Sequence, residues 1–296
     1  MWTATRPRLI VCVSSWSCAV DNPFVSTEWL AAHLSDPDVV VLDGSWHMPN
    51  SSRNAQAEYL AGHIPGAIFF DIDGVADNTT DLPHMLPAPN DFARMVGALG
   101  IADTMCIVVY DELGLFSAPR VWWTFRTMGA ADVRILSGGG PQWRAERRPT
   151  ETGLVTRPRQ TFHTDLDLSR VAGFEAVRDR SRDGATQIAD ARPAPRFHGE
   201  APEPRAGLRS GHVPGSINVP VSLLTEGGKL KPADELKQIF TTRGLDLTQP
   251  IITTCGSGIT ASTLALALAQ AGATEVSLYD GSWAEWGARK DAEVES

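Results

Sequence analysis

Short apolar runs alternate along this chain with longer segments that have a helical pattern. The apolar runs are rich in β-branched residues and predict buried strands, which occupy residues 39–43, 105–110, 133–136, 187–190, 251–254 and 276–279. Helix formers with apolar residues on one face predict helices between them, among others at 27–34, 90–99, 118–128 and 261–271. This alternation predicts an α/β fold built on parallel sheets.

The order of elements in the first half recurs in the second half. The loop at residues 62–67 (GHIPGA) returns as 211–216 (GHVPGS), and the strand at 107–111 returns at 251–255. A repeat of about half the chain length predicts two homologous domains, each a parallel sheet flanked by helices. We place the first domain at residues 23–144, a linker at 145–165 and the second domain at 166–290. Residues 1–22 are an extension that a signal, a disordered tail or a mis-started segment would each explain.

The second domain carries one cysteine in a loop with special chemistry. Residues 251–254 predict a strand, 255–260 (CGSGIT) a six-residue loop, and the following segment a helix that ends at Gly272. Cys255 would then lie at a helix N-terminus, where unpaired N–H groups and the helix dipole favour a thiolate. Gly256 and Gly258 let the backbone N–H groups converge around the sulfur as an anion-binding nest.

Other readings of Cys255 are weaker. A buried structural cysteine does not need two flanking glycines, and no second cysteine stands in a metal-binding spacing. A phosphatase loop would need an arginine six positions after the cysteine and usually has a histidine just before it. Here those positions hold Ala261 and Thr254. A neutral loop of this size suits an extra sulfur atom on Cys255, a persulfide, better than it suits a phosphate.

Composition narrows the class of partner. The net charge of -9 argues against nucleic acid and anionic membranes, and no apolar run is long enough to span a membrane. Four cysteines are too few for a disulfide scaffold, so we expect a reducing compartment such as the cytoplasm. Nothing in the sequence predicts a metal or an organic cofactor.

Three motifs together resemble the 3-mercaptopyruvate sulfurtransferases of the two-domain rhodanese superfamily. They are residues 255–260 (CGSGIT), 279–286 (YDGSWAEW) and 203–220 (EPRAGLRSGHVPGSINVP). The resemblance runs from about residue 24 to about residue 288. It implies transfer of sulfur from 3-mercaptopyruvate through a Cys255 persulfide, release of pyruvate, and passage of the sulfur to thioredoxin, glutathione or cyanide.

The resemblance also implies roles for individual residues. Arg196 and Arg205 would bind the carboxylate and ketone oxygens of the substrate, while Gly256, Gly258, Ile259 and Thr260 would line the loop around it. In the family, a first-domain histidine and the loop serine form a proton relay, which we expect here from His63 and Ser257. We expect structural roles for Arg192, His212 and Asp73.

The first domain is expected to be catalytically silent. Its loop at the position of Cys255 begins Asp111-Glu112 and contains no cysteine, and both acids would repel a thiolate or an anionic substrate. Cys106 lies in or next to a buried strand and is expected to be structural. Two alternatives to the main reading remain: a thiosulfate sulfurtransferase on the same fold, and a non-enzymatic sulfur carrier.

Overall fold

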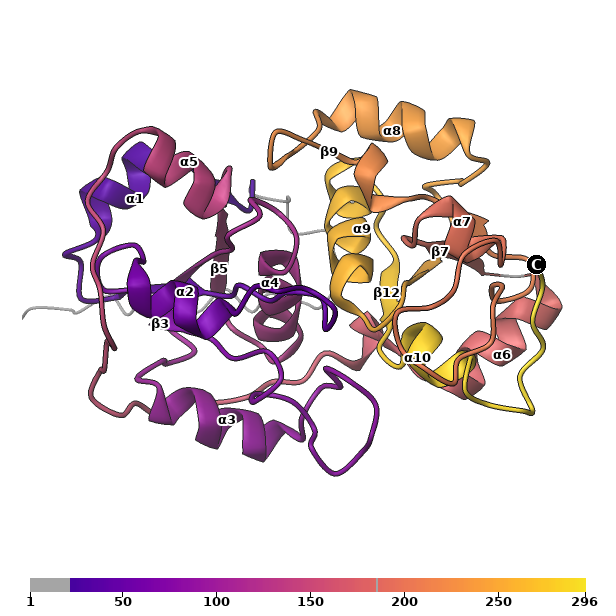
Figure 1. Cartoon of the computed structure of the whole chain (residues 1–296), viewed down its shortest axis with the longest axis horizontal. Coiled ribbons are helices and arrows are strands. Elements are labelled where there is room, and N and C mark those ends of the chain that lie inside the picture. Colours follow the sequence, from indigo (N-terminus) through magenta and orange to yellow (C-terminus); the bar gives the residue numbers. More distant parts are fainter. Residues whose placement is uncertain (1–21, 185) are drawn as a thin grey trace, which may run out of the picture.

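The computed structural model describes residues 22–184 and 186–296, which form two α/β domains side by side (Figure 1). The predicted extension at residues 1–22 therefore lies outside the described residues, apart from residue 22. Each domain is built on a five-stranded sheet in which all strand pairs are parallel. The predicted fold class is thus confirmed.

The first domain has the strand order β1-β5-β4-β2-β3, with β4 in the centre. Its strands are β1 (Phe24–Val25), β2 (Val39–Asp43), β3 (Ile68–Phe69), β4 (Cys106–Tyr110) and β5 (Asp132–Leu136). Its helices are α1 (Thr27–His33), α2 (Ala55–Ala61), α3 (Pro89–Ala98), α4 (Ala118–Thr127) and α5 (Gly139–Ala145).

The second domain repeats this topology as β6-β12-β11-β7-β8, with β11 in the centre. Its strands are β6 (Val171–Ala172), β7 (Gln187–Asp190), β8 (Ile217–Asn218), β11 (Ile251–Thr254) and β12 (Val276–Tyr279), with a hairpin of β9 (Thr225–Glu226) and β10 (Lys229–Leu230). Its helices are α6 (Phe174–Asp183), α7 (Ala194–Phe197), α8 (Ala233–Thr242), α9 (Ile259–Gln270) and α10 (Ser282–Trp286), with short 3-10 turns at Leu168–Arg170 and Val221–Leu223.

The equal strand orders place β4 and β11 at equivalent positions. The carboxyl ends of parallel strands meet at one edge of a sheet, which is where α/β proteins commonly bind ligands. The loops that follow β4 and β11 therefore decide what each domain can bind. They are residues 111–117 in the first domain and residues 255–258 in the second.

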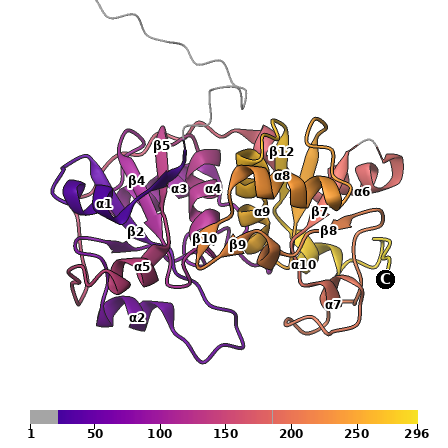
Figure 2. The same ribbon diagram turned by 90° about the horizontal axis from the view of Figure 1, so that it is seen from above.

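The two domains share one apolar core. Its largest cluster contains residues of both, among them Val121 and Phe125 of α4 and Leu264 and Leu268 of α9. Helices α4 and α9 pack against each other across the boundary, and the β9–β10 hairpin also lies there (Figure 2). Nearly every residue of α9 is buried, which explains why its sequence is apolar on all sides.

The structure corrects two details of the sequence reading. Helix α9 begins at Ile259 rather than at residue 261, because Gly258 adopts a left-handed conformation (φ 85°) and caps the helix directly. The loop after β11 is therefore Cys255-Gly256-Ser257-Gly258, with Ile259 and Thr260 in the first helical turn. The linker at 145–165, which we expected to cross the surface, also contributes to the core, because Phe162 is buried against Phe92 and Phe125 of the first domain.

No helix in the described part of the chain is long and apolar enough to cross a membrane.

Candidate active site

Cys255 stands at the point where β11 ends, one short loop before α9. Only 2% of the residue is exposed. The segment after β12 fixes the Cys255 backbone: its N–H donates to Ser282 Oγ at 3.3 Å, and its carbonyl accepts from the Trp283 N–H at 2.9 Å. Ser282 has a positive φ of 48°, a strained conformation that neighbouring contacts hold in place. The loop is thus fixed in its shape before any ligand arrives.

The backbone N–H groups that follow Cys255 are free donors within the described residues. The N–H groups from Gly256 to Thr260 make no hydrogen bond to another residue in the described ranges. They lie at the N-terminus of α9, where the helix dipole also favours negative charge. This geometry suits an anionic sulfur on Cys255, as the sequence predicts.

Arg196 lies directly beside this loop. A Cβ atom added at Gly256 would lie 3.0 Å from Arg196 Nη2, so a glycine leaves room for the guanidinium. Glu203 holds Arg196 in place, accepting hydrogen bonds from its Nε at 3.1 Å and from its Nη2. The Arg196 side chain is still 18% exposed, so the guanidinium remains accessible to a ligand in the cleft.

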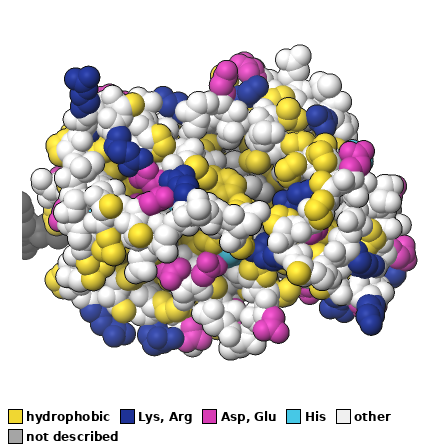
Figure 3. All heavy atoms as spheres, in the orientation of Figure 1, with side chains coloured by type: hydrophobic (Ala, Val, Ile, Leu, Met, Phe, Trp, Pro, Cys, Tyr) yellow, Lys and Arg dark blue, Asp and Glu magenta, His cyan; other side chains and the backbone are white. Residues whose placement is uncertain are grey.

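Arg205 is half-buried and interacts electrostatically with Cys255. Burial lowers the pKa of Arg205 below its ordinary value, while Cys255 and Asp73 act in the opposite direction. The two arginines predicted to bind substrate thus both lie near the cysteine loop. In the view of Figure 3, basic side chains lie beside apolar ones close to the boundary between the domains.

A histidine of the first domain reaches across to this arginine. His84 Nε2 lies 3.3 Å from Arg205 Nη2, and His84 Nδ1 lies 2.7 Å from Asp73 Oδ1. Burial lowers the pKa of His84, which favours a neutral ring at pH 7. A neutral ring that carries its proton on Nδ1 places this proton beside Asp73 and leaves Nε2 as an acceptor for Arg205. Asp73 therefore contacts His84 and Trp46 in addition to its own loop.

The predicted relay between His63 and Ser257 is not formed. His63 is 1% exposed; its Nδ1 lies 2.8 Å from the carbonyl of Tyr59, and its ring stacks on the Tyr59 ring. His212, its counterpart in the repeat, makes the same two contacts with Phe197. Both histidines stabilise the turn that the two domains share. Ser257 is 5% exposed, and its hydroxyl has no hydrogen-bond partner among the described residues.

His84 escaped the sequence reading because its signal is weak. It stands in an irregular segment (Pro83-His84-Met85) that has no counterpart in the second domain. Its positive φ of 63° is uncommon for a residue other than glycine, and such strain gathers at functional sites. The dihedral angle identifies the residue, but it is visible only in the structure.

Arg192 has the structural role that we expected. Its guanidinium is 1% exposed and binds Asp190 at 2.6 Å, Glu203 at 2.8 Å and the carbonyl of Gly211 at 3.0 Å. It also covers the ring of Trp283 at 4.3 Å. Glu203 joins Arg192 to Arg196, so the buried pair supports the arginine beside the loop.

The loop of the first domain differs from the expected repulsive surface. The Asp111 carboxylate turns into its own loop, where Oδ2 accepts from the N–H groups of Phe116 at 2.7 Å, Ser117 at 2.9 Å and Ala118 at 2.8 Å. Glu112 is paired with Arg144. Neither acid is thus free to repel a ligand, because Asp111 binds the N–H groups of its own loop and Glu112 is paired.

Cys106 is half-buried beside Asp132, and burial raises the pKa of its thiol to about 11. Such a thiol is a poor nucleophile at neutral pH, in line with a structural role. Within the described ranges, no group of three or more His, Cys, Asp or Glu side chains is placed to hold a metal ion.

Comparison with known proteins identifies the family of the chain. The family profile described as "Rhodanese-like domain" matches residues 26–146 and 174–289, and the chain belongs to this family, with two such domains in tandem. It is 47% identical to the 3-mercaptopyruvate sulfurtransferase of Escherichia coli over 92% of this chain and 97% of that protein.

A further relative and a solved structure are similar to this chain over most of their length. The mitochondrial thiosulfate/3-mercaptopyruvate sulfurtransferase 1 of Arabidopsis thaliana is 42% identical, over 96% of this chain and 80% of that protein. The crystal structure of SseA, described as a 3-mercaptopyruvate sulfotransferase from Escherichia coli, superposes with a TM-score of 0.83 at 44% identity and covers 88% of this chain and 99% of that one.

Proposed function

We propose that this protein is a sulfurtransferase that takes the sulfur of 3-mercaptopyruvate onto Cys255 and passes it to a thiol or to cyanide. The observation that carries the proposal is the run of free N–H donors that follows Cys255, with Arg196 beside this loop and Arg205 interacting electrostatically with Cys255. The names of relatives at 47% and 42% identity support the choice of donor.

The reaction has two steps, transfer of sulfur to Cys255 and transfer from Cys255 to the acceptor. The Cys255 thiolate attacks the sulfur of 3-mercaptopyruvate, an S–S bond forms, and the C–S bond breaks. The electron pair of the C–S bond goes to the organic fragment as pyruvate enolate, which takes up a proton and leaves as pyruvate. The acceptor then attacks the outer sulfur of the persulfide and regenerates the Cys255 thiolate. An acceptor thiol becomes a hydropersulfide, and cyanide becomes thiocyanate.

The arginines bind the substrate in this proposal. A guanidinium matches a planar carboxylate with two parallel hydrogen bonds, and Glu203 limits the directions in which Arg196 can point. Arg205 would hold the ketone oxygen, where negative charge develops as the enolate forms. Both interactions favour an α-keto acid as the donor.

Proton transfer to the enolate is assigned to Ser257 together with His84 in place of His63. His84 is a first-domain histidine that contacts a substrate-binding candidate, and its Asp73 contact fixes the tautomer. The first domain, which has no cysteine in its loop, would therefore contribute a side chain to the reaction.

A comparison of donors tests the proposal. With cyanide as the common acceptor, we expect turnover of 3-mercaptopyruvate to exceed that of thiosulfate, and Arg196→Ala to remove most of the difference by raising KM. Cys255→Ser should abolish turnover with either donor while the thermal transition is retained. Turnover by Cys255→Ser would refute the persulfide mechanism, and inactivity of the wild type with both donors would favour the carrier reading.

Thiosulfate is the second candidate donor, because the Arabidopsis relative carries both substrates in its name. The loop at residues 255–258 contains no Lys or Arg to pair with a dianion, which favours 3-mercaptopyruvate. The acceptor is also a proposal: thioredoxin, glutathione and cyanide each supply a nucleophile able to attack the outer sulfur. Rates with the three acceptors at equal concentration would rank them.

A further inference from the structure

Arg120 is a buried arginine of the first domain that contacts residues of both domains. It lies in the first turn of α4 and is only 2% exposed. Its Nη2 lies 2.7 Å from Asp280 Oδ1 of the second domain and donates to the carbonyl of His84 in the first. A buried charge this well enclosed has a large desolvation cost and needs several partners.

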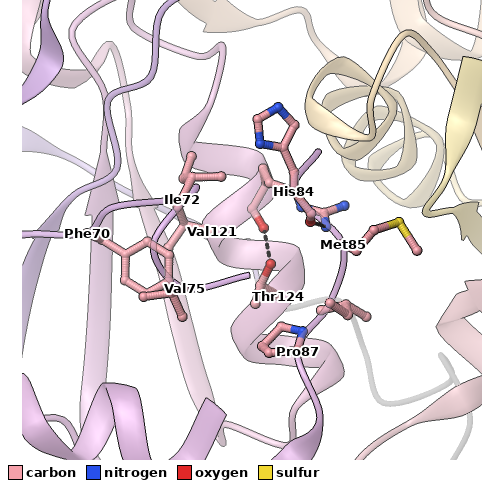
Figure 4. A pocket seen from close by; sticks show the side chains of 10 residues that line it. Phe70, Ile72, Val75, His84, Met85, Pro87, Val121 and Thr124 are labelled. Atoms are coloured by element: carbon pink, nitrogen blue, oxygen red, sulfur yellow. Dashed lines mark hydrogen bonds between the residues drawn. The ribbon is translucent and has the colours of Figure 1, made fainter. Parts of the chain in front are cut away.

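Asp280 completes a clamp between the domains. It follows β12 and is 4% exposed, with one carboxylate oxygen on Arg120 and the other accepting from the Leu86 N–H at 2.7 Å. The segment from His84 to Leu86 is thus held at both ends, by Arg120 and by Asp280. Figure 4 shows the His84 ring turned away from Phe70 and Val75, which line a small cavity beneath this segment.

The same guanidinium also reaches the cysteine loop. A Cβ atom added at Gly258 would lie 2.7 Å from Arg120 Nη1, and this nitrogen is buried without a hydrogen-bond partner in the described part of the chain. The ring of Trp123, 4.6 Å from Arg120 Cζ, limits the guanidinium on another side. Gly258 is therefore required twice, for its left-handed backbone and for the space that Arg120 occupies.

We propose that Arg120 is a positioning residue that sets the His84 segment of the first domain against the Cys255 loop of the second. This inference rests on the proposed function, because it assigns His84 to the reaction that Cys255 carries out. Arg120 does not touch the substrate in this proposal. It fixes the distance between two groups that come from different domains and that must act on the same molecule.

The cavity beneath the His84 segment explains why a clamp is needed. It lies among Phe70, Ile72, Val75, Met85 and Thr124, and it has room for about one water molecule. The segment above it is irregular. Without Arg120 and Asp280, the His84 ring would keep its contacts with Asp73, Arg205 and the Trp46 ring. The backbone of the segment would depend on the hydrogen bond between the carbonyl of Met85 and the Asp77 N–H.

The test compares kcat with KM in clamp variants. Arg120→Lys keeps the charge, but one ammonium nitrogen cannot take the places of both Nη2, which contacts Asp280 and the His84 carbonyl, and Nη1, which lies beside Gly258. We expect kcat with 3-mercaptopyruvate to fall about 10- to 100-fold while KM changes less than about threefold, since Arg196 and Arg205 are untouched. Arg94→Lys, which alters an exposed pair with Asp91, is the matched control and should leave both constants unchanged.

A double variant separates positioning from stability. Arg120→Gln alone leaves Asp280 charged and buried, so it is expected to lower Tm strongly. Arg120→Gln with Asp280→Asn removes both charges, and Tm should recover toward the wild type while kcat stays low. Recovery of kcat along with Tm, or an Arg120→Lys variant with wild-type kcat, would refute the inference. Lack of wild-type turnover would instead refute the proposed function.

Discussion

The carboxylate of Asp111 occupies in the first domain the place that the sulfur of Cys255 would occupy in the second. Both residues directly follow the central strand of their sheet, and in both domains a short loop leads from there to a helix. In the first domain the N–H groups just before and at the start of that helix donate to Asp111. In the second domain the N–H groups from Gly256 to Thr260 have no acceptor among the described residues. The loop after the central strand therefore binds a carboxylate of its own in the first domain, whereas the N–H groups of the equivalent loop in the second domain are free to bind another anion.

Removing the internal anion should destabilise the first domain. Asp111→Ala leaves the N–H groups of Leu113, Phe116, Ser117 and Ala118 without their acceptor, and we expect the free energy of unfolding to fall by about 2–4 kcal/mol. Urea unfolding measures this difference. Asp91→Ala, at an exposed position, should change the free energy by less than about 0.5 kcal/mol. A loss below about 1 kcal/mol for Asp111→Ala would show that the loop does not depend on its carboxylate.

A cysteine placed in the silent loop should not create a second active site. Asp111→Cys in a Cys255→Ser background supplies a thiol at the equivalent position, but Arg196 and Arg205 lie at the other loop. We expect turnover of 3-mercaptopyruvate to stay at the level of Cys255→Ser alone. Restored turnover would mean that a loop and a thiol suffice without the arginines.

Exchange of two histidines tests the correction to the relay. His84→Gln should lower kcat by about 100-fold, as expected for loss of a general acid or base, with little change in Tm. His63→Gln should lower Tm, because it disturbs a buried turn, and change kcat less than about threefold. Steady-state kinetics and thermal melts of both variants measure kcat and Tm. A large loss of kcat in His63→Gln, with wild-type kcat in His84→Gln, would return the proton-transfer role to His63.

The buried carboxyl of Asp43 should make stability depend on pH. Burial raises its pKa to about 6, and Oδ2 has no hydrogen-bond partner in the described ranges. Because the folded-state pKa lies above the unfolded value, stability is lost as pH rises through about 6. We expect Asp43→Asn to be more stable than the wild type by about 2 kcal/mol at pH 8, with the gap closing toward pH 4.

The repeat offers a matched control for this titration. Asp190 ends β7 as Asp43 ends β2, but its carboxylate is bound by Arg192 at 2.6 Å. Asp190→Asn should therefore lower Tm at pH 8, since Arg192 keeps its charge with one acid fewer. Equal signs for the two variants would contradict the assignment of Asp43 as an unpaired buried acid.

The two described cysteines should differ in reactivity. At pH 8 the Cys106 thiol, with its pKa raised to about 11, is almost wholly protonated and should react slowly with iodoacetamide. Cys255 should react faster, and prior incubation with 3-mercaptopyruvate should protect it. Peptide mass spectrometry reports both sites. Rapid labelling of Cys106, or loss of turnover in Cys106→Ala, would contradict its structural role.

Much of the fold followed from local pattern. Strands buried on both faces have continuous apolar sequences, so β2, β4 and β11 were evident, and the repeat supplied their order. Cys255 was evident because a strand, two glycines and a helix surround it within a few residues. Strands as short as Phe24–Val25 have no pattern of their own and are defined only by pairing with β5.

Contacts between residues of the two domains could not be predicted from local sequence patterns. His84 and Arg205 are 121 positions apart, and Arg120 meets Gly258 only because α4 packs on α9. The repeat drew attention to His63. This histidine and His212 occur in both domains and hold the turn that the domains have in common, whereas His84 has no counterpart in the second domain.

The packing of α4 on α9 means that the two halves have lost their autonomy. Helix α9 is enclosed by its own sheet, by α8 and by a helix of the other half, so excision of residues 166–290 would leave one of its apolar sides in water. Each half therefore covers apolar surface that the other would expose, and the first domain supports the fold of the domain that carries Cys255.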